Sequence, residues 1–206
     1  MLKIWGRSDS ANVQKVLWAC EEMGLPFERE DVGGKFGRTK EPFYLAMNPN
    51  ARVPTIDDDG FILWESNACV RYLAAKHDRG GLCLADPQAY ADADRWMDWQ
   101  QTTVIPFMTT IFWNLVRTPA PERDQAKIDA AVQQGLDIWP ILGARLEGRD
   151  FIMGGQLTMA DIPLAIQAYR WVKLVENRPA MPAFEAWVER CRARPGFEKW
   201  IDRPLT

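Results

Sequence analysis

The stretch from Asn50 to Ser66, NARVPTIDDDGFILWES, places polar residues at both ends of an apolar hairpin pattern. Two extended runs flank a turn at Asp59-Gly60, which is typical of a β-hairpin. Glu65 and Ser66 then begin a helical pattern, and the first N–H groups of a helix have no partner within it. The start of a helix therefore favours an anion, which makes this pair a candidate anion site. An ordinary helix cap is the alternative interpretation of the same two residues.

The N-terminal part of the chain predicts the elements that hold this hairpin. Residues 2–5 form a short apolar strand. From Val13 to Cys20, apolar residues recur at i, i+3, i+4 and i+7, which indicates a helix. A charge-rich edge strand over 27–32 and a short helix over about 42–47 come before the hairpin, and another helix follows it. The resulting order, β-α-β-α-β-β-α, predicts a compact open-sheet domain.

The remainder of the chain, from Pro87 onward, predicts helices only. The segment LTMADIPLA begins one of them. Thr158 is expected to cap this helix, and Asp161, three residues on, can reach back to it, which is a capping box with Asp in place of the usual Glu. We therefore expect two domains: an α/β domain over residues 1–80 and an all-helical domain over residues 86–206.

The composition is that of a globular protein with no surface suited to nucleic acid. Of the 206 residues, 47% are hydrophobic and 26% are charged, which is typical of a packed domain. The net charge of −3 argues against nucleic acid or an anionic membrane as a partner. No apolar run reaches the length of a membrane span, and the N-terminal sequence shows no export signal. A cytoplasmic location is expected.

Cysteine and histidine usage argues against a metal site. None of the four cysteines has CxxC spacing or another metal-ligand spacing, so no metal is expected. Four scattered thiols fit a reducing cytoplasm. The single histidine, His77, argues against a catalytic triad that depends on histidine.

Four segments of the chain together resemble the cytosolic glutathione S-transferases. SDSANVQKVLWACEEMGLPFE is similar to the family's first strand–helix region, and NPNARVPTIDDDGFILWESNACVRYLA is similar to its substrate-binding core. LTMADIPLA resembles a helix-capping segment of the family, and MPAFEAWVERCRARPGFEKW resembles its C-terminal helices. The serine-containing N-terminal region looks most like theta-, delta- and bacterial-type members. The resemblance covers nearly the whole chain and implies a thioredoxin-like domain, an all-helical domain and a detoxifying transferase that uses glutathione.

The resemblance implies a role for both ends of the hairpin. The Val53-Pro54 bond is expected to be cis, and the backbone of Val53 is expected to pair with the extended cysteinyl unit of glutathione by strand addition. Ser66 is expected to bind the γ-glutamyl carboxylate, and Glu65 is expected to bind the γ-glutamyl ammonium group. Asn67 is a weaker contact candidate.

Basic residues are expected to hold the glycine carboxylate of glutathione. Arg52, two residues before the proline of the hairpin, is the first candidate. Lys35, Arg38 and Lys40, in the loop near the second helix, are alternatives. Solvation alone is the competing interpretation, because surface basic residues commonly have no other role.

The same resemblance places the reactive sulfur beside the loop RSDSAN. A thiol with a pKa of about 8.5 is only a few per cent ionised at pH 7. A hydrogen-bond donor and the dipole of the first helix must therefore lower that pKa. Ser8 is the first candidate donor, Ser10 is the second and can instead cap the helix, and Asn12 is the third. The tyrosine donor of other classes is absent, because Trp5 and Gly6 stand in its place.

The helical domain is expected to supply a pocket for a second substrate. The candidates are Phe107, Met108, Phe112 and Trp113, although aromatic residues at helical spacing usually belong to a core. We thus expect a homodimeric transferase that adds glutathione to a small hydrophobic electrophile. The alternatives are a glutathione-binding module without turnover, and a glutathione-dependent peroxidase or disulfide reductase of the same fold.

Overall fold

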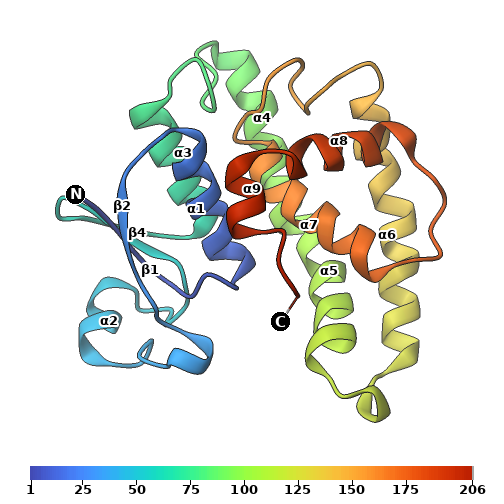
Figure 1. Cartoon of the computed structure of the whole chain (residues 1–206), viewed down its shortest axis with the longest axis horizontal. Coiled ribbons are helices and arrows are strands. Elements are labelled where there is room, and N and C mark those ends of the chain that lie inside the picture. The colour runs from blue at the N-terminus through green and yellow to red at the C-terminus, as the bar shows by residue number, and fades with distance from the viewer. Residues whose placement is uncertain (206) are drawn as a thin grey trace. The chain divides into compact units, whose positions relative to one another are not determined.

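The computed structural model describes residues 1–205, which divide into two compact units (Figure 1). The α/β unit comprises Met1–Cys83 and Pro195–Arg203. The helical unit comprises Leu84–Arg194 and the described residues after Arg203. The observed architecture, a mixed sheet with helices followed by a helical unit, is the predicted one.

The α/β unit contains a sheet of four short strands. The strands are β1 (Leu2–Trp5), β2 (Phe27–Glu30), β3 (Thr55–Asp58) and β4 (Phe61–Trp64). Their order in the sheet is β2-β1-β3-β4, so the charge-rich β2 lies at an edge, as its composition predicted. β1 is parallel to β2 and antiparallel to β3, and β3 and β4 form the predicted hairpin.

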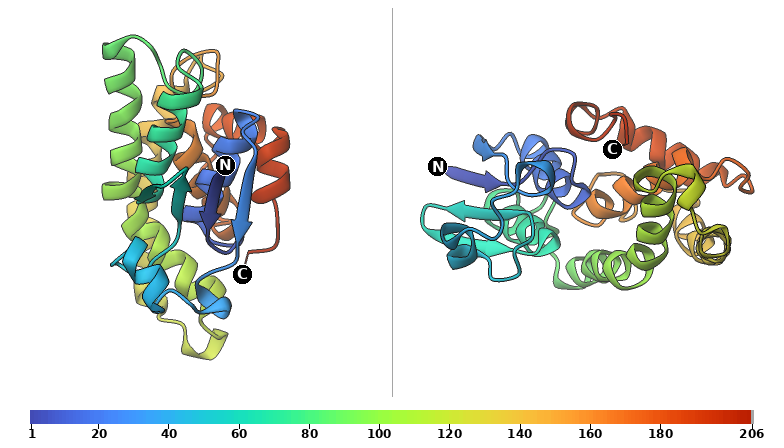
Figure 2. Two further views of the ribbon diagram at one scale, coloured as in Figure 1. Left: turned by 90° about the vertical axis from the view of Figure 1, so that its left-hand side faces the viewer. Right: turned by 90° about the horizontal axis from the view of Figure 1, so that it is seen from below.

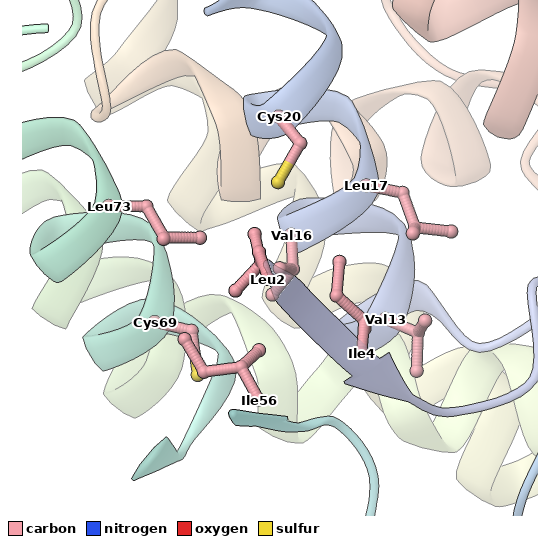
Figure 3. Close-up of a cluster of buried hydrophobic side chains, with 9 residues drawn as sticks. All are labelled: Leu2, Ile4, Val13, Val16, Leu17, Cys20, Ile56, Cys69 and Leu73. Atoms are coloured by element: carbon pink, nitrogen blue, oxygen red, sulfur yellow. The ribbon is translucent and has the colours of Figure 1, made fainter. Parts of the chain in front are cut away.

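Two helices, α1 (Ala11–Glu22) and α3 (Ser66–His77), cover one face of this sheet. Alternate residues of a strand point to opposite faces, so Leu2 and Ile4 of β1 share the face that the helices cover. Figure 3 shows the resulting core, in which the side chains of β1 and β3 meet those of both helices. Its buried members are Leu2, Ile4, Val13, Val16, Leu17, Cys20, Ile56, Cys69 and Leu73.

The opposite face of the sheet carries α2 (Pro42–Met47) and a short 3₁₀ turn, η1 (Gly34–Phe36). A second, smaller core forms there from Trp5, Val32 and Tyr44. Tyr44 is fully buried, so α2 is attached to the sheet through one aromatic side chain. The helices therefore lie on both faces, which leaves one end of the sheet for a binding site.

The last helix of the chain, α9 (Pro195–Trp200), belongs to the α/β unit, although the sequence pattern grouped it with the helical domain. It packs against α1 through an edge-to-face contact between the rings of Trp18 and Phe197, whose centroids are 5.0 Å apart. Gly196 permits this approach, because a Cβ atom there would lie 2.7 Å from the Trp18 ring. This packing joins two helices that are far apart in the sequence, so no local sequence pattern predicts it.

The helical unit contains three separate helices and a long rod built from shorter helical segments. The rod runs through α4 (Pro87–Trp99), η2 (Gln100–Val104), α5 (Ile105–Phe112) and η3 (Trp113–Arg117), and Figure 2 shows its first three segments following one another. η2 is a π-helical segment that ends two residues before Pro106, which has no backbone N–H to donate within the rod. A short turn, η4 (Ala120–Glu122), leads to α6 (Gln125–Leu146), α7 (Asp161–Leu174) and α8 (Pro182–Arg192). Within residues 1–205, every helix is too short or too polar to cross a lipid bilayer.

Asp161 at the start of α7 is the polar centre of the helical unit. Its carboxylate is fully buried and accepts hydrogen bonds from the Ile152 and Thr158 N–H groups, both at 2.9 Å. The Thr158 hydroxyl at 3.2 Å and the Trp187 indole N–H at 2.9 Å complete a set of four donors. Burial raises the pKa of Asp161 to about 6, and the four hydrogen bonds oppose that rise.

Only one of the two hydrogen bonds of the expected capping box is formed. Asp161 reaches back to the Thr158 N–H, as predicted. The Thr158 hydroxyl, however, donates to the Asp161 carboxylate, and Ala160 occupies the N-cap position. Asp161 therefore joins the start of α7 to the loop before it and to Trp187 on α8.

Asp161→Asn should destabilise the protein by about 2–4 kcal/mol, because the amide nitrogen replaces one acceptor oxygen and faces two donors. Urea unfolding followed by far-UV circular dichroism measures this change. Asp129→Asn, which alters an exposed residue of α6, is the matched control and should change stability by less than about 0.5 kcal/mol. Equal changes in the two variants would contradict the structural role of Asp161.

Candidate functional site

One end of the sheet in the α/β unit collects four separate segments of the chain. Thr55, the first residue of β3, lies opposite Trp5 at the end of β1 and opposite Trp64 at the end of β4. Glu30 at the end of β2 also lies opposite Trp5. The loops after β1 and β2, the turn before β3 and the start of α3 therefore meet at this end. These four segments hold the residues that the resemblance assigned to glutathione, except Asn12, which lies in α1.

The turn before β3 presents an unpaired piece of backbone. The Val53-Pro54 peptide bond is cis, as the resemblance implied. Within residues 1–205, neither the N–H nor the C=O of Val53 has a hydrogen-bond partner. The Val53 side chain packs on both cores of the unit, which fixes its backbone in place. An extended peptide can pair with these two groups as a short added strand.

Two buried side chains anchor this turn from α2 and the residue after it. The Tyr44 hydroxyl donates to the Arg52 carbonyl at 2.7 Å, and the Asn48 amide donates to the same oxygen at 2.9 Å. Both groups also contact the Thr55 hydroxyl, at 2.9 Å and 3.1 Å respectively. The chain is therefore held on both sides of Val53. The sequence analysis missed this anchor, and the available signal was two polar residues four apart in a short helix.

The start of α3 is not an ordinary helix cap. Glu65 occupies the N-cap position but makes no side-chain capping bond, and Ser66 is already the first helical residue. Glu65 is an exposed residue with φ of 71° and ψ of 109°, a backbone conformation that side-chain-bearing residues rarely adopt. Such conformations persist where the surrounding structure enforces them, and they concentrate at functional sites. Glu65 therefore does not cap α3, and a helix start of this kind can bind an anion.

The Ser66 hydroxyl faces α1 across the first turn of α3. It accepts a hydrogen bond from the Lys15 ammonium at 3.3 Å and donates to the Asn12 side-chain oxygen at 3.4 Å. Asn67 is also buried, and its side-chain oxygen accepts a hydrogen bond from Lys15 at 2.9 Å. The structure thus brings Asn12, Ser66 and Asn67 together around Lys15. The sequence analysis did not single out Lys15, whose only local signal was a lysine on a helix otherwise predicted to be a core helix.

The loop between β1 and α1 holds the two serine candidates. Ser10 occupies the N-cap position of α1, and its side chain makes no capping hydrogen bond. Ser8 is half-buried, and its carbonyl accepts a hydrogen bond from the Gln14 side chain at 3.1 Å. Asn12 is the second residue of α1 and lies beside Ser66, so the three candidate donors occupy different environments. The Ser10 hydroxyl lies where the dipole of α1 is most positive.

Asp9, between the two serines, is ion-paired with Arg7 at 2.8 Å. An unpaired carboxylate there would raise the pKa of a neighbouring thiol. The guanidinium of Arg7 offsets this charge, so the loop can hold an aspartate beside an anionic sulfur.

The basic candidates fall at the same end of the sheet but differ in their contacts. The Arg52 and Lys40 side chains are exposed. Arg38 contacts Glu30 at 2.6 Å and Glu41 at 3.6 Å, and its partner Glu30 has a lowered pKa chiefly because of that hydrogen bond. Arg38 is thus engaged with its neighbours, whereas Arg52 and Lys40 extend into solvent.

The four candidates for a second-substrate pocket lie on α5 and η3 of the helical unit. Phe107 and Met108 are buried, and the Phe107 ring contacts Trp139 and Trp171 edge-on. Phe112 is half-buried beneath the Arg170 guanidinium, 4.4 Å from the ring centroid. Trp113 is 60% exposed. Phe107 therefore has a packing role in this unit. The side chains of Phe112 and Trp113 are accessible to solvent and could contact a ligand.

The protein's own thiols are not placed for catalysis. All four cysteines are free and buried. Burial raises the pKa of Cys20 and of Cys69 to about 12, so both stay uncharged at neutral pH. Neither thiol is therefore suited to act as a nucleophile. Among residues 1–205, no group of three potential metal ligands is found.

Comparison with known proteins agrees with this geometry. Residues 9–76 match the model of the glutathione S-transferase N-terminal domain, and residues 104–195 match the model of its C-terminal domain. The chain belongs to the glutathione S-transferase family. It is 38% identical over 192 residues to glutathione S-transferase GstB of Escherichia coli K12, and the match covers 92% of each chain.

Solved structures extend the comparison to the whole fold. The crystal structure of the theta class glutathione S-transferase from Xanthomonas axonopodis pv. citri, with glutathione bound, matches with a TM-score of 0.94 and 42% identity. That match covers 100% of this chain and 99% of the other. Glutathione transferase F7 from Populus trichocarpa matches with a TM-score of 0.85 and 26% identity over 97% of each chain. Both domains of the family are thus present, in the predicted order.

Asn48→Ala should destabilise the protein by about 2–3 kcal/mol, because it leaves the Arg52 carbonyl and the Thr55 hydroxyl with fewer partners. Urea unfolding measures the change. Asn50→Ala, at an exposed position two residues away, is the matched control and should have an effect below about 0.5 kcal/mol. A negligible effect of Asn48→Ala would show that the turn before β3 does not depend on this anchor.

Proposed function

We propose that this protein binds glutathione in an extended form at one end of the sheet of the α/β unit. The cysteinyl unit pairs with the N–H and C=O of Val53. The γ-glutamyl carboxylate binds at the start of α3, at Ser66, and the Glu65 carboxylate binds the γ-glutamyl ammonium group. Arg52 or Lys40 holds the glycine carboxylate. The observation that supports this most strongly is the unpaired Val53 backbone at the same end of the sheet as the uncapped start of α3.

The thiolate forms at the start of α1. We favour Ser10 as the hydrogen-bond donor over Ser8 and Asn12, because Ser10 stands at the N-cap and its hydroxyl makes no capping bond. A hydrogen bond to a charged group contributes about 1.5–3 kcal/mol, and the helix dipole adds to it. Together they can lower the thiol pKa by about two units, which requires roughly 2.7 kcal/mol. The sulfur is then mostly ionised at neutral pH.

The transfer step joins this sulfur to a small hydrophobic electrophile. The thiolate attacks the electrophilic atom, a carbon–sulfur bond forms, and the leaving group departs or the acceptor takes up a proton. Holding both reactants together lowers the entropic part of the barrier. Phe112 and Trp113, which keep accessible surface, are the favoured contacts for the electrophile, ahead of the buried Phe107 and Met108.

The proposal includes a homodimer that works in the cytoplasm and takes part in detoxification. The four free cysteines suit a reducing compartment. Sedimentation equilibrium at micromolar concentration tests the oligomeric state. A single species with the mass of one chain would contradict the dimer.

Ser10→Ala should raise the pKa of enzyme-bound glutathione by about 1–2 units, because it removes one charge-assisted hydrogen bond to the sulfur. Thiolate absorbance measured across a pH series gives the bound pKa directly. Ser8→Ala is the matched control, since it removes the same hydroxyl two residues away, and it should leave the bound pKa nearly unchanged. Conjugation of a model aryl halide should fall in parallel with the thiolate fraction.

Other outcomes of the same experiment have distinct meanings. A raised pKa in Ser8→Ala or in Asn12→Ala, but not in Ser10→Ala, would transfer the donor role to that residue. Retention of glutathione without conjugation would favour a binding module, and activity restricted to peroxides or disulfides would favour a reductase. Failure of the wild-type protein to retain glutathione in equilibrium dialysis would overturn the proposed function.

A further inference from the structure

Lys15 carries a buried charge in the middle of the α/β unit. It lies on α1 between core residues, and only 1% of its surface is exposed. A buried ammonium group is costly unless hydrogen bonds and nearby negative charge offset its loss of water. Its Nζ atom donates to Asn67 at 2.9 Å and to Ser66 at 3.3 Å. The charge is therefore directed at the first two residues of α3.

The two acceptors of Lys15 define the geometry of the helix start. Ser66 and Asn67 supply the first backbone N–H groups of α3, which have no acceptor within the helix. By accepting from Lys15, the Ser66 oxygen leaves its own proton free to donate to a ligand or to Asn12. The buried ammonium also adds a full positive charge behind the partial positive charge of the helix dipole. Both effects favour an anion directly in front of α3.

We propose that Lys15 is a positioning residue for the carboxylate subsite of the glutathione site. Its hydrogen bonds orient the side chains of Ser66 and Asn67. Its charge makes the start of α3 selective for a ligand whose γ-glutamyl group carries an α-carboxylate. This inference rests on the proposed function, because glutathione is the ligand whose carboxylate is recognised. Lys15 itself does not touch the ligand.

The test compares glutathione with an analogue that lacks one group. The analogue is γ-aminobutyryl-cysteinyl-glycine, which has the same backbone without the α-carboxylate. Lys15→Met keeps the length of the side chain and removes the charge. It should weaken glutathione binding by roughly 10- to 100-fold, measured by isothermal titration calorimetry, and change binding of the analogue by less than about threefold. The preference for glutathione over the analogue is thus the diagnostic quantity.

Two further variants separate this role from a general effect on folding. Val16→Ala, at the neighbouring core position of α1, weakens the same helix packing and should leave the preference unchanged. Lys15→Gln retains a hydrogen-bond donor but carries no charge, so it should lose most of the preference for glutathione over the analogue. If Lys15→Met does not fold, the result for Lys15→Gln tests the inference. Equal weakening of both ligands in a folded Lys15 variant would overturn the inference, as would an unchanged preference. Absence of glutathione binding to the wild type would instead contradict the proposed function.

Discussion

The pairing of β3 with both of its neighbours from its first residue is the constraint on which the site depends. Thr55 is opposite Trp5 on one side and Trp64 on the other, so the ends of β1 and β4 cannot move independently of the turn before β3. The buried hydroxyl of Thr55 is also an anchor point for Tyr44 and Asn48, which hold the Arg52 carbonyl. A single backbone position thereby aligns the edge that is proposed to bind glutathione with the starts of both helices.

The electrostatic design of the α/β unit follows from this alignment. α1 and α3 both begin at the same end of the sheet, so two positive helix ends lie at the proposed binding site. One end suits a thiolate and the other suits a carboxylate, and Lys15 lies behind the latter. The negative charge of Asp9 is offset by Arg7, and the protein's own thiols are kept neutral by burial. The unit thus concentrates positive potential where a tripeptide anion is proposed to bind.

Local patterns predicted most of the α/β unit because its elements are short and have sharp boundaries. The Val53-Pro54 and Glu65-Ser66 pairs mark the ends of the hairpin in sequence, and the structure brings them to one end of the sheet. Two kinds of feature escaped prediction. Tyr44 and Lys15 act through partners outside their own helices, Arg52 and Ser66, so a local pattern cannot show which groups they bind. The role of Ser10 was similarly ambiguous, because a serine before a helix predicts a capping bond that the structure does not contain.

The position of α9 has a consequence for how the protein is made. Gln14 donates to the Ser8 carbonyl at 3.1 Å and to the Trp200 carbonyl at 2.9 Å, so the serine loop is tied to the last turn of the final helix. A ribosome delivers the first 83 residues well before residues 195–203 emerge. The nascent chain can form the sheet early, but this loop gains its second anchor only after α9 has been synthesised. The second anchor of the serine loop therefore depends on a segment that is translated after the helical unit.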